Sequence, residues 1–386
     1  MRAVVHVRIE RGFAMASLND DQNRRNIFCT TGSLQERGLR HLARRVGGWW
    51  LLLPIALWAF AIVVGLELLP KTDMGTAALP TPSMRVIAPR IPTPFALQPK
   101  QPTSTPVAVQ APSIMPKVKN EGTPPQRKAR TPDPNPSTDH FVVVDGASGA
   151  ILFQRNAFEP VAPASLTKIM TGLLVVEYGK LDEKVRVDVD AGGYPDSCVM
   201  GLRINTEVGL RDLLYGLILA SGNDAAVAIA RHLTGGVGSA FMNKMNEKAA
   251  WLGLGGTHFE NPHGFDEENH YSCPADMVTL ARYAMQYPEF RKVVATRSYE
   301  VQSPTDKSSL ENLNGILRAY PGSDGVKTGD TPEAGKCLVA TAVRDGHRVY
   351  VAFMRSSSGS VPDGTLLLDW AFDSHYWGST QSSPGQ

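Results

Sequence analysis

The chain has 386 residues, of which 39 are basic and 37 acidic, so that its formal net charge is only +2. A charge this close to zero gives no electrostatic reason to expect a nucleic-acid-binding protein. The four cysteines, Cys29, Cys198, Cys273 and Cys337, form no CxxC pair, which excludes a disulfide scaffold and a zinc finger. We expect the last three to be small buried residues, with Cys198 near the cleft of the domain.

An uncharged run of 21 residues spans positions 46–66, VGGWWLLLPIALWAFAIVVGL. This length predicts a transmembrane helix, kinked at Pro54. Six arginines lie between residues 24 and 45, so the positive-inside rule places residues 1–45 in the cytoplasm and the rest of the chain outside. A cleaved signal peptide is the alternative, but its apolar part should have about 7–15 residues. We therefore expect an uncleaved signal anchor.

Residues 67–139 follow this span and predict a disordered, proline-rich linker. Between residues 70 and 139 lie 16 of the 28 prolines, which break helices and strand ladders alike. Extended at about 3.1 Å per residue, such a linker reaches on the order of 200 Å. Its lysines and arginines are expected to be solvated.

Regular structure is predicted from residue 140 onward, in a domain over 140–375 followed by a disordered tail at 376–386. Residues 140–145 and 150–154 favour a hairpin, and a helix starts near Ser165 and stops near Gly179. Strands at both ends of the domain with helices between them indicate an α+β fold and not a parallel sheet. The further helices are predicted over 211–220, 223–233, 240–251, 275–285 and 366–372, and the closing strands over 336–343 and 348–354.

Ser165 and Lys168 stand three residues apart near the start of the first of these helices. Residues at i and i+3 are neighbours on a helix, so the two side chains can touch. One interpretation is a serine N-cap with a lysine extending to water. The other is a nucleophile beside the base that takes its proton.

Two further short motifs follow in order, Ser221-Gly-Asn223 and Lys327-Thr-Gly329. Each alone could be structural, the first as a helix cap and the second as a turn into a strand. Together with Ser165-Leu-Thr-Lys168 they match the signature of penicillin-binding proteins and serine β-lactamases. The flanking stretches APASLTKIMTGLL, LLYGLILASGNDAAVAIA and DGVKTGDTPEAGKCLVATA extend the match. Most of residues 140–375 resembles the serine D-Ala-D-Ala carboxypeptidases, the low-molecular-mass penicillin-binding proteins.

The resemblance implies a β-lactamase/transpeptidase-like fold, an antiparallel sheet flanked by helices with a helical subdomain, and an enzyme that needs no cofactor or metal. It implies that Ser165 is the nucleophile and that Lys168 is its base. It implies that Ser221 relays protons toward the leaving amine, and that Asn223 positions Lys168 and the substrate amide. Lys327 and Thr328 would bind the terminal carboxylate of the substrate, and the strand after them would pair with the peptide backbone. Gly329 and Asp330 complete the implied substrate-binding residues. The N–H groups of Ser165 and Asp330 would form the oxyanion hole.

The implied partners are the stem peptides of peptidoglycan as substrates, β-lactam antibiotics as inhibitors and the membrane through the N-terminal helix. Two departures from the family pattern bear on the substrate. The residue after the Lys-Thr-Gly motif is Asp330, where an aromatic residue or histidine is usual. Near the final helix, Ser360 stands where relatives usually carry an arginine, and Arg355 is the nearest cation. An endopeptidase acting on cross-links, or a catalytically weak penicillin-binding or wall-binding module, are therefore alternatives.

The residues suggest two other functions. A zinc peptidase would need ligands such as His258, His263 and His270, but their spacing contains no HExxH pattern, so we expect structural hydrogen bonds instead. A β-lactamase would need a carboxylate that activates the deacylating water, for which Glu260 is the local candidate.

Overall fold

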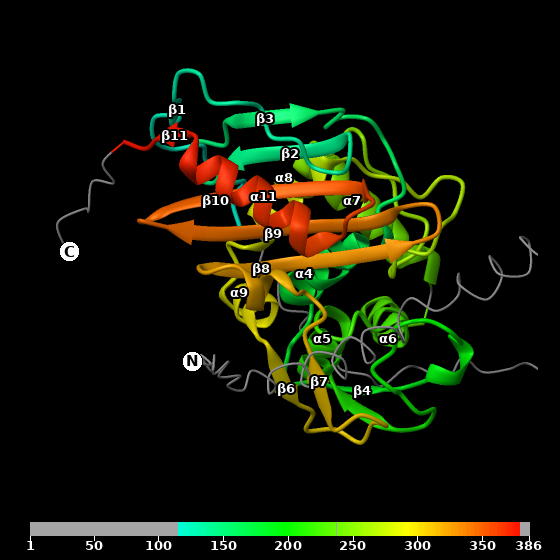
Figure 1. Ribbon diagram of the computed structural model, residues 1–386. Helices are drawn as coiled ribbons and strands as arrows, with labels where there is room; N and C mark the ends of the chain where they lie inside the picture. Colours follow the sequence, from blue (N-terminus) through cyan, green and yellow to red (C-terminus); the bar gives the residue numbers. More distant parts are fainter. Residues whose placement is uncertain (1–114, 237, 379–386) are drawn as a thin grey trace, which may run out of the picture. The chain divides into compact units, whose positions relative to one another are not determined.

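The computed structural model describes residues 115–236 and 238–378. They contain a five-stranded sheet in the order β3-β2-β10-β9-β8, in which each neighbouring pair is antiparallel. The terminal hairpin β9–β10 lies between the first strands of the domain and β8, so the two ends of the domain meet in one sheet (Figure 1). The strands are β2 (His140–Asp145), β3 (Ile151–Arg155), β8 (Ser323–Thr331), β9 (Gly335–Arg344) and β10 (His347–Ser356). The predicted α+β fold with an antiparallel sheet is confirmed.

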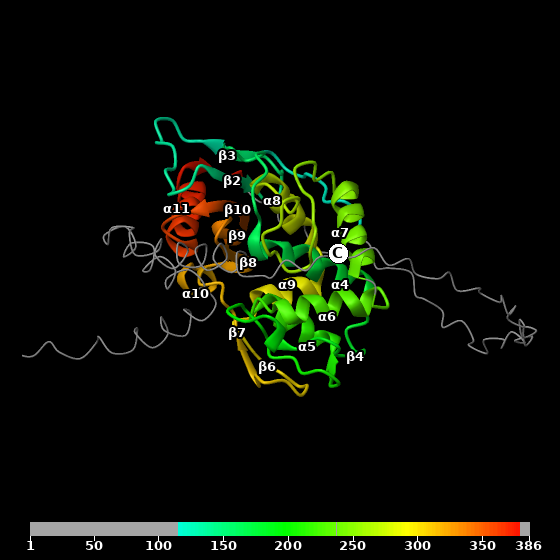
Figure 2. The same cartoon turned by 90° about the vertical axis from the view of Figure 1, so that its right-hand side faces the viewer.

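Helices cover both faces of this sheet. Figure 2 shows α11 on one side of the strands and α8, α7 and α4 on the other. The helical elements are the 3-10 turns η2 (Ala164–Thr167) and η3 (Ala191–Gly193) and the helices α4 (Lys168–Tyr178), α5 (Leu210–Ile218), α6 (Asn223–Leu233), α7 (Gly238–Leu252), α8 (Pro274–Ala284), α9 (Pro288–Ala295), α10 (Ile316–Ala319) and α11 (Ser360–Asp373).

Burial on both faces explains why β2 reads as a continuous apolar run. Successive side chains of a strand point to opposite faces. Phe141 and Val143 pack in the core under α11, and Val142 and Val144 pack in the larger core on the side of α4 and α8. A sheet with only one buried face would instead show alternating polar residues.

In the part of the chain that the structure describes, three short two-stranded sheets lie outside the central one. Two of them flank the helical block around α5, where the chain forms the predicted helical subdomain (Figure 1). These are β4 (Lys184–Arg186) with β5 (Glu207–Gly209), and β6 (Ser298–Glu300) with β7 (Ser309–Glu311). The third pairs β1 (Gln126–Arg127) with β11 (His375–Tyr376).

The prediction that the linker stays disordered up to residue 139 is wrong for residues 115–139. Besides the pairing of β1 with β11, Trp370 Nε1 donates a hydrogen bond to Pro132 O over 2.8 Å. Met115 N donates to the Tyr287 hydroxyl over 2.8 Å. Proline removes backbone donors but leaves carbonyls and ring surface for tertiary contacts, which the composition of a segment does not reveal. The folded domain therefore starts well before the predicted boundary at 140.

The C-terminal boundary at 375 is also shifted, because Tyr376 belongs to β11. The predicted cytoplasmic segment 1–45, the membrane span 46–66, linker residues 67–114 and tail residues 379–386 lie outside the described residues. Among the helices that are described, none has the length and apolarity needed to cross a membrane.

Helix α11 begins at Ser360, six residues before the predicted start at 366. Its first turns contain Pro362 and Gly364, which lie before the predicted start. Proline is tolerated in the first turn of a helix, where its missing N–H would have no intrahelical partner. Cys273 and Cys337 are buried, as predicted.

Candidate active site

Ser165 lies on the 3-10 turn η2, directly before α4, and not inside a regular α-helix. The N-cap residues of η2 and α4 are Pro163 and Thr167, so the N-cap interpretation of Ser165 is wrong. The preceding Ala164 has a φ of 50°, in the left-handed region. A Cβ at Gly264 would lie 1.9 Å from Ala164 O, so only glycine lets the loop after α7 cross the chain here.

Lys168 is completely buried, and its Nζ has three oxygen neighbours. It lies 3.0 Å from Ser165 Oγ and donates to Asn223 Oδ1 over 2.7 Å and to His263 O over 2.6 Å. Burial and the nearby positive charge of Lys327 hold the pKa of Lys168 well below its ordinary value, against a weaker opposing effect of Asp224. The predicted contact between Ser165 and Lys168 is thus present in the structure.

Ser221 and Asn223 lie at the junction between α5 and α6. Ser221 is buried and has a φ of 55°, which turns the chain sharply into α6. Asn223 N donates to Cys198 O over 2.8 Å, which places Cys198 at the site, as predicted. Asn223 therefore holds two groups at once, the Lys168 amine through its side chain and the loop before β5 through its backbone.

The Lys-Thr-Gly motif lies within β8 itself and not in a turn that leads into a strand. β8 is the last strand of the central sheet, so in the described chain one of its edges carries no neighbouring strand. Lys327 pairs across with Val339 and Gly329 with Cys337, on the face that also carries η2. A Cβ at Gly329 would lie 3.0 Å from Ser165 N. The motif thus lies against the predicted nucleophile.

Lys327 is 2% exposed, and its Nζ donates to Thr328 O over 3.0 Å. Among the described residues no carboxylate lies within ion-pair distance of this Nζ. Burial lowers the pKa of Lys327 to about 7. A buried cation without a protein counter-ion provides a site for an anionic ligand group.

Asp330, the unusual residue after the motif, forms an ion pair with Lys336 of the neighbouring strand. The two residues are directly opposite each other in the β8–β9 register. An uncompensated carboxylate at this position would repel an anionic substrate. The charge of Asp330 is instead compensated by a lysine whose position across the strand could not be read from the motif itself.

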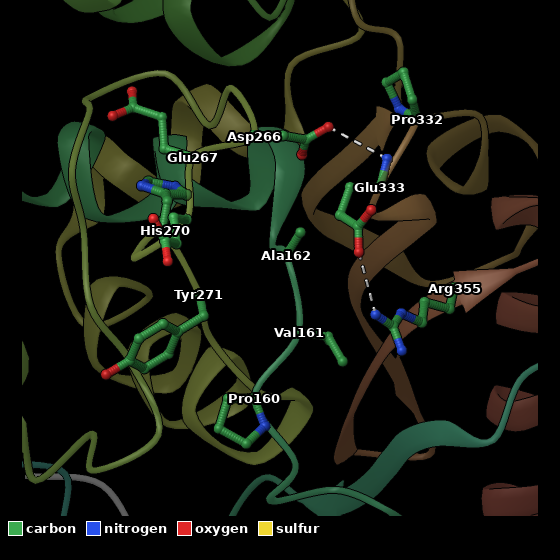
Figure 3. A pocket seen from close by; sticks show the side chains of 11 residues that line it. Pro160, Val161, Ala162, Asp266, Glu267, His270, Tyr271, Pro332, Glu333 and Arg355 are labelled. Atoms are coloured by element: carbon green, nitrogen blue, oxygen red, sulfur yellow. Dashed lines mark hydrogen bonds and ion pairs between the residues drawn. The ribbon is translucent and has the colours of Figure 1, made fainter.

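Arg355 and Ser360 do not provide a cation at β8. Arg355 lies 3.6 Å from Glu333 and lines a cavity of about 690 Å³, whose wall also carries Asp266, Glu267 and Glu268. Figure 3 shows Arg355 pointing toward Glu333, on the opposite side of the cavity from His270 and Tyr271. Asp266 accepts hydrogen bonds from Thr331 Oγ1 and Glu333 N, which connects this loop to the end of β8.

The histidines of the loop between α7 and α8 have structural contacts. His270 Nδ1 accepts from Glu260 N, so its Nε2 carries the proton and donates to Thr167 Oγ1 over 2.8 Å. Burial lowers the pKa of His270 to about 4 and that of His263 to about 3. Glu260, the carboxylate considered for a β-lactamase, pairs with His258 at 3.5 Å. In the described residues no group of three His, Cys, Asp or Glu side chains could hold a metal ion.

Sequence reasoning missed four residues that shape the site. Two of them are Lys336, which pairs with Asp330, and His263, whose carbonyl accepts from Lys168 Nζ. Asp224 is buried and accepts from the N–H groups of residues 200–202, and Asn261 Oδ1 accepts from the N–H groups of residues 263–265. The sequence signal for Asp224 is a carboxylate that directly follows Ser-Gly-Asn and precedes the apolar run 225–230.

Comparison with known proteins agrees with this geometry. The family model described as D-alanyl-D-alanine carboxypeptidase matches residues 126–358, more than half of the chain. The chain belongs to this family. The matched range begins at β1, consistent with the earlier start of the folded domain.

Curated relatives match over similar lengths. The D-alanyl-D-alanine carboxypeptidase DacF of Bacillus subtilis is 38% identical over 61% of this chain and 62% of its own length. DacA of Haemophilus influenzae is 35% identical over 65% of this chain and 63% of its own length. The present chain therefore spans less than two thirds of the length of these two relatives.

Among solved structures, the crystal structure of the DD-transpeptidase of Streptomyces K15 is similar with a TM-score of 0.59 and 32% identity. It covers 63% of this chain and 100% of the K15 chain. A penicillin-binding protein homologue from Mycobacterium tuberculosis has the same TM-score and identity, over 67% of this chain and 98% of its own. The described domain thus has the transpeptidase-like fold, and the similarity extends over all or nearly all of the chains of these two proteins.

Proposed function

We propose that the protein is a serine-type D-Ala-D-Ala carboxypeptidase that trims peptidoglycan stem peptides through an acyl-enzyme on Ser165. The observation that carries this proposal is the surroundings of Lys168 Nζ. A neutral amine has two N–H donors and one lone pair. The two carbonyl oxygens of Asn223 and His263 take the donors, which leaves the lone pair for the Ser165 hydroxyl at 3.0 Å. The lowered pKa of Lys168 favours this neutral form.

The first step is attack of Ser165 Oγ on the carbonyl carbon of the penultimate D-alanine, while the hydroxyl proton moves to Lys168 Nζ. The carbonyl oxygen gains negative charge, and the N–H groups of Ser165 and Asp330 are the donors for it. Gly329 supports this role because its missing side chain lets β8 approach Ser165 N. The open edge of β8 gives the peptide backbone of the substrate a strand to pair with.

The second step breaks the C–N bond and releases D-alanine, whose nitrogen takes the proton held on Lys168 through Ser221. Water then attacks the ester carbonyl: its hydroxyl completes the carboxyl group of the shortened stem peptide, its other proton returns to Ser165 Oγ, and the peptide leaves. The terminal carboxylate of the substrate binds Lys327 and Thr328. The lack of a carboxylate partner for Lys327 among the described residues supports this assignment, as does the ion pair that compensates the charge of Asp330.

The test uses the full chain and a stem peptide that ends in D-Ala-D-Ala, with free D-alanine as the readout and Ser165→Ala as the control. Release that disappears in the variant supports the proposal. Covalent labelling of Ser165 by benzylpenicillin without D-alanine release would contradict the proposal and favour a penicillin-sequestering module. Cleavage of cross-linked dimers would then favour an endopeptidase. Because the similar K15 protein is named a DD-transpeptidase, the reaction is repeated with an added amine acceptor, which compares hydrolysis with transfer of the acyl group.

We also propose that residues 46–66 anchor the protein in the cell membrane, with the catalytic domain outside the cytoplasm. The uncharged 21-residue run and the arginines before it support this placement. Residues 67–114 would then connect the span to the folded domain. Protease accessibility of the domain in intact spheroplasts, together with retention in the membrane fraction after high salt, tests the topology. Release by salt alone would contradict it.

A further inference from the structure

Two loops reach the predicted catalytic groups and carry aromatic side chains beside them. The loop at 261–267 contributes His263, whose carbonyl accepts from Lys168 Nζ over 2.6 Å. The loop at 190–202 contributes Cys198, whose carbonyl accepts from Asn223 N over 2.8 Å. Each loop is therefore bonded directly to one of the two residues that organise the Ser165 nucleophile.

The aromatic side chains of these loops meet one another. The Tyr194 ring lies 6.2 Å from the ring of His263 and 6.4 Å from that of Phe265, measured between centroids. His263 and Phe265 are 4.3 Å apart. We refer to Tyr194, His263 and Phe265 as the aromatic cluster. Phe265 is 39% exposed, although contact between a large apolar ring and water is unfavourable.

The aromatic cluster is held in place from both sides. Asp224 accepts hydrogen bonds from the N–H groups of Met200, Gly201 and Leu202, which fixes the end of the first loop to α6. In the second loop Asn261 Oδ1 accepts from Gly264 N over 2.6 Å and from Phe265 N over 3.2 Å. The rings consequently present a surface whose shape is set before any ligand binds.

This surface is also uncharged at neutral pH. Burial and the nearby Lys168 hold the pKa of His263 at about 3, so its ring is neutral. The strand β8 differs, because it presents Lys327, Thr328 and the Asp330–Lys336 ion pair. β8 thus carries charged groups, whereas the rings of the aromatic cluster carry none.

We propose that the aromatic cluster is a specificity-determining surface that contacts the acyl donor, the part of the substrate or penicillin that stays on Ser165. The inference rests on the proposed function, because it assumes that Ser165 carries the acyl group. Lys168 Nζ contacts both Ser165 Oγ and the His263 carbonyl, so an acyl group on Ser165 lies beside the residue whose ring meets Tyr194 and Phe265. The fitting ligand class is an aliphatic or aromatic side group next to the acylated carbonyl.

The test compares two penams with the same ring system. Benzylpenicillin carries a phenylacetyl side group, and 6-aminopenicillanic acid carries none. Acylation rates of the full chain are measured for wild type, Tyr194→Ala and Phe265→Ala. Loss of one ring contact is expected to slow acylation by benzylpenicillin roughly tenfold and to leave 6-aminopenicillanic acid within about twofold. Ile204→Ala is the matched control, since Ile204 is an exposed apolar residue on the same connection and lines a different pocket.

Tyr194→Phe and Phe265→Leu complete the set, because they keep an apolar side chain of similar size. Tyr194→Phe is expected to retain the rate with benzylpenicillin, and Phe265→Leu to lose less than Phe265→Ala. An equal loss with both penams would overturn the inference, because the rings would then act only by positioning Lys168. Unchanged rates with both penams would overturn it as well. A wild-type protein that neither penam labels would instead overturn the proposed function, and the inference with it.

Discussion

Gly329 lies so close to Ser165 that no side-chain atom fits between β8 and the turn that carries the nucleophile. A Cβ at Gly329 would lie 3.0 Å from Ser165 N and 2.9 Å from Ala164 Cβ. The N–H of Ser165 and the N–H of the next strand residue, Asp330, are the two donors assigned to the oxyanion. Their spacing therefore depends on how closely β8 can approach η2.

Gly329→Ala is expected to slow acylation by benzylpenicillin by roughly 10²–10³-fold, the loss that follows removal of one oxyanion donor. The side chain would push β8 away from Ser165 N and open the pair of donors. Stopped-flow or gel-based labelling rates measure the effect. Gly255→Ala is the control, because a Cβ there meets nothing within 4 Å. A Gly329→Ala protein that labels at the wild-type rate would remove the oxyanion hole from this position.

Asn223→Asp is expected to abolish most acylation at neutral pH and to restore part of it at higher pH. A carboxylate 2.7 Å from Lys168 Nζ would raise the pKa of that lysine and keep it protonated, so that it could not take the serine proton. The measurement is the rate of benzylpenicillin labelling as a function of pH. An activity loss with an unshifted acidic limb would show that Asn223 acts only through the substrate.

The value of kcat/KM for a D-Ala-D-Ala peptide should fall as pH rises through about 7. This parameter reports the ionisation of the free enzyme, in which the pKa of Lys327 is about 7. Below that pH Lys327 is charged and binds the terminal carboxylate, and above it the charge is lost. Lys327→Arg should remove this limb, because arginine stays protonated. A peptide with a C-terminal amide serves as the control, since it offers no carboxylate to Lys327.

Lys336→Ala is expected to lower kcat/KM for the same peptide severalfold, because the carboxylate of Asp330 would then face the anionic substrate unpaired. Asp330→Asn in the Lys336→Ala background should recover most of the loss. The four proteins of this double-mutant cycle are compared at low and at 0.5 M salt, and screening should reduce the difference. Lys184→Ala, at an exposed position on β4, controls for the general loss of a positive charge. Additive effects of the two substitutions would contradict charge compensation.

A chain that begins at residue 138 should unfold at a lower temperature than one that begins at residue 113. The shorter chain lacks β1 and its pairing with β11, the Pro132 carbonyl that accepts from Trp370, and the contacts of Met115. Each buried donor or acceptor left without its partner costs about 1–3 kcal/mol. Thermal melts followed by circular dichroism measure the difference. Equal melting temperatures would mean that residues 115–137 contribute no stability.

The sequence predicted the core of the fold and the identities of the candidate site residues because both depend on local patterns. The apolar run of β2 and the helical spacing after Ser165 specify their elements, and three short motifs name the residues that meet at the site. What could not be predicted depends on residues distant in the chain. The contact of Lys168 with the His263 carbonyl joins positions 95 apart, and no motif encodes it.

The same limit explains the misplaced domain boundary. Proline content correctly indicates that residues 115–139 form little regular structure, since only two of them are in a strand. It does not predict whether such a segment packs against a domain. That packing depends on Tyr283, Tyr287 and Trp370, which lie far along the chain. The role of Lys336 was missed for a related reason, because cross-strand register is set by the turn between β8 and β9.

The attachment of Met115 has a mechanical consequence. Its N–H donates to the Tyr287 hydroxyl, its carbonyl lies 2.9 Å from the Tyr283 hydroxyl, and both phenols are hydrogen-bonded to Glu177 Oε1. Glu177 belongs to α4, the helix whose first residue is Lys168. Tension applied to the chain ahead of residue 115 would therefore be transmitted to the helix that carries the lysine, by way of two phenols and one carboxylate.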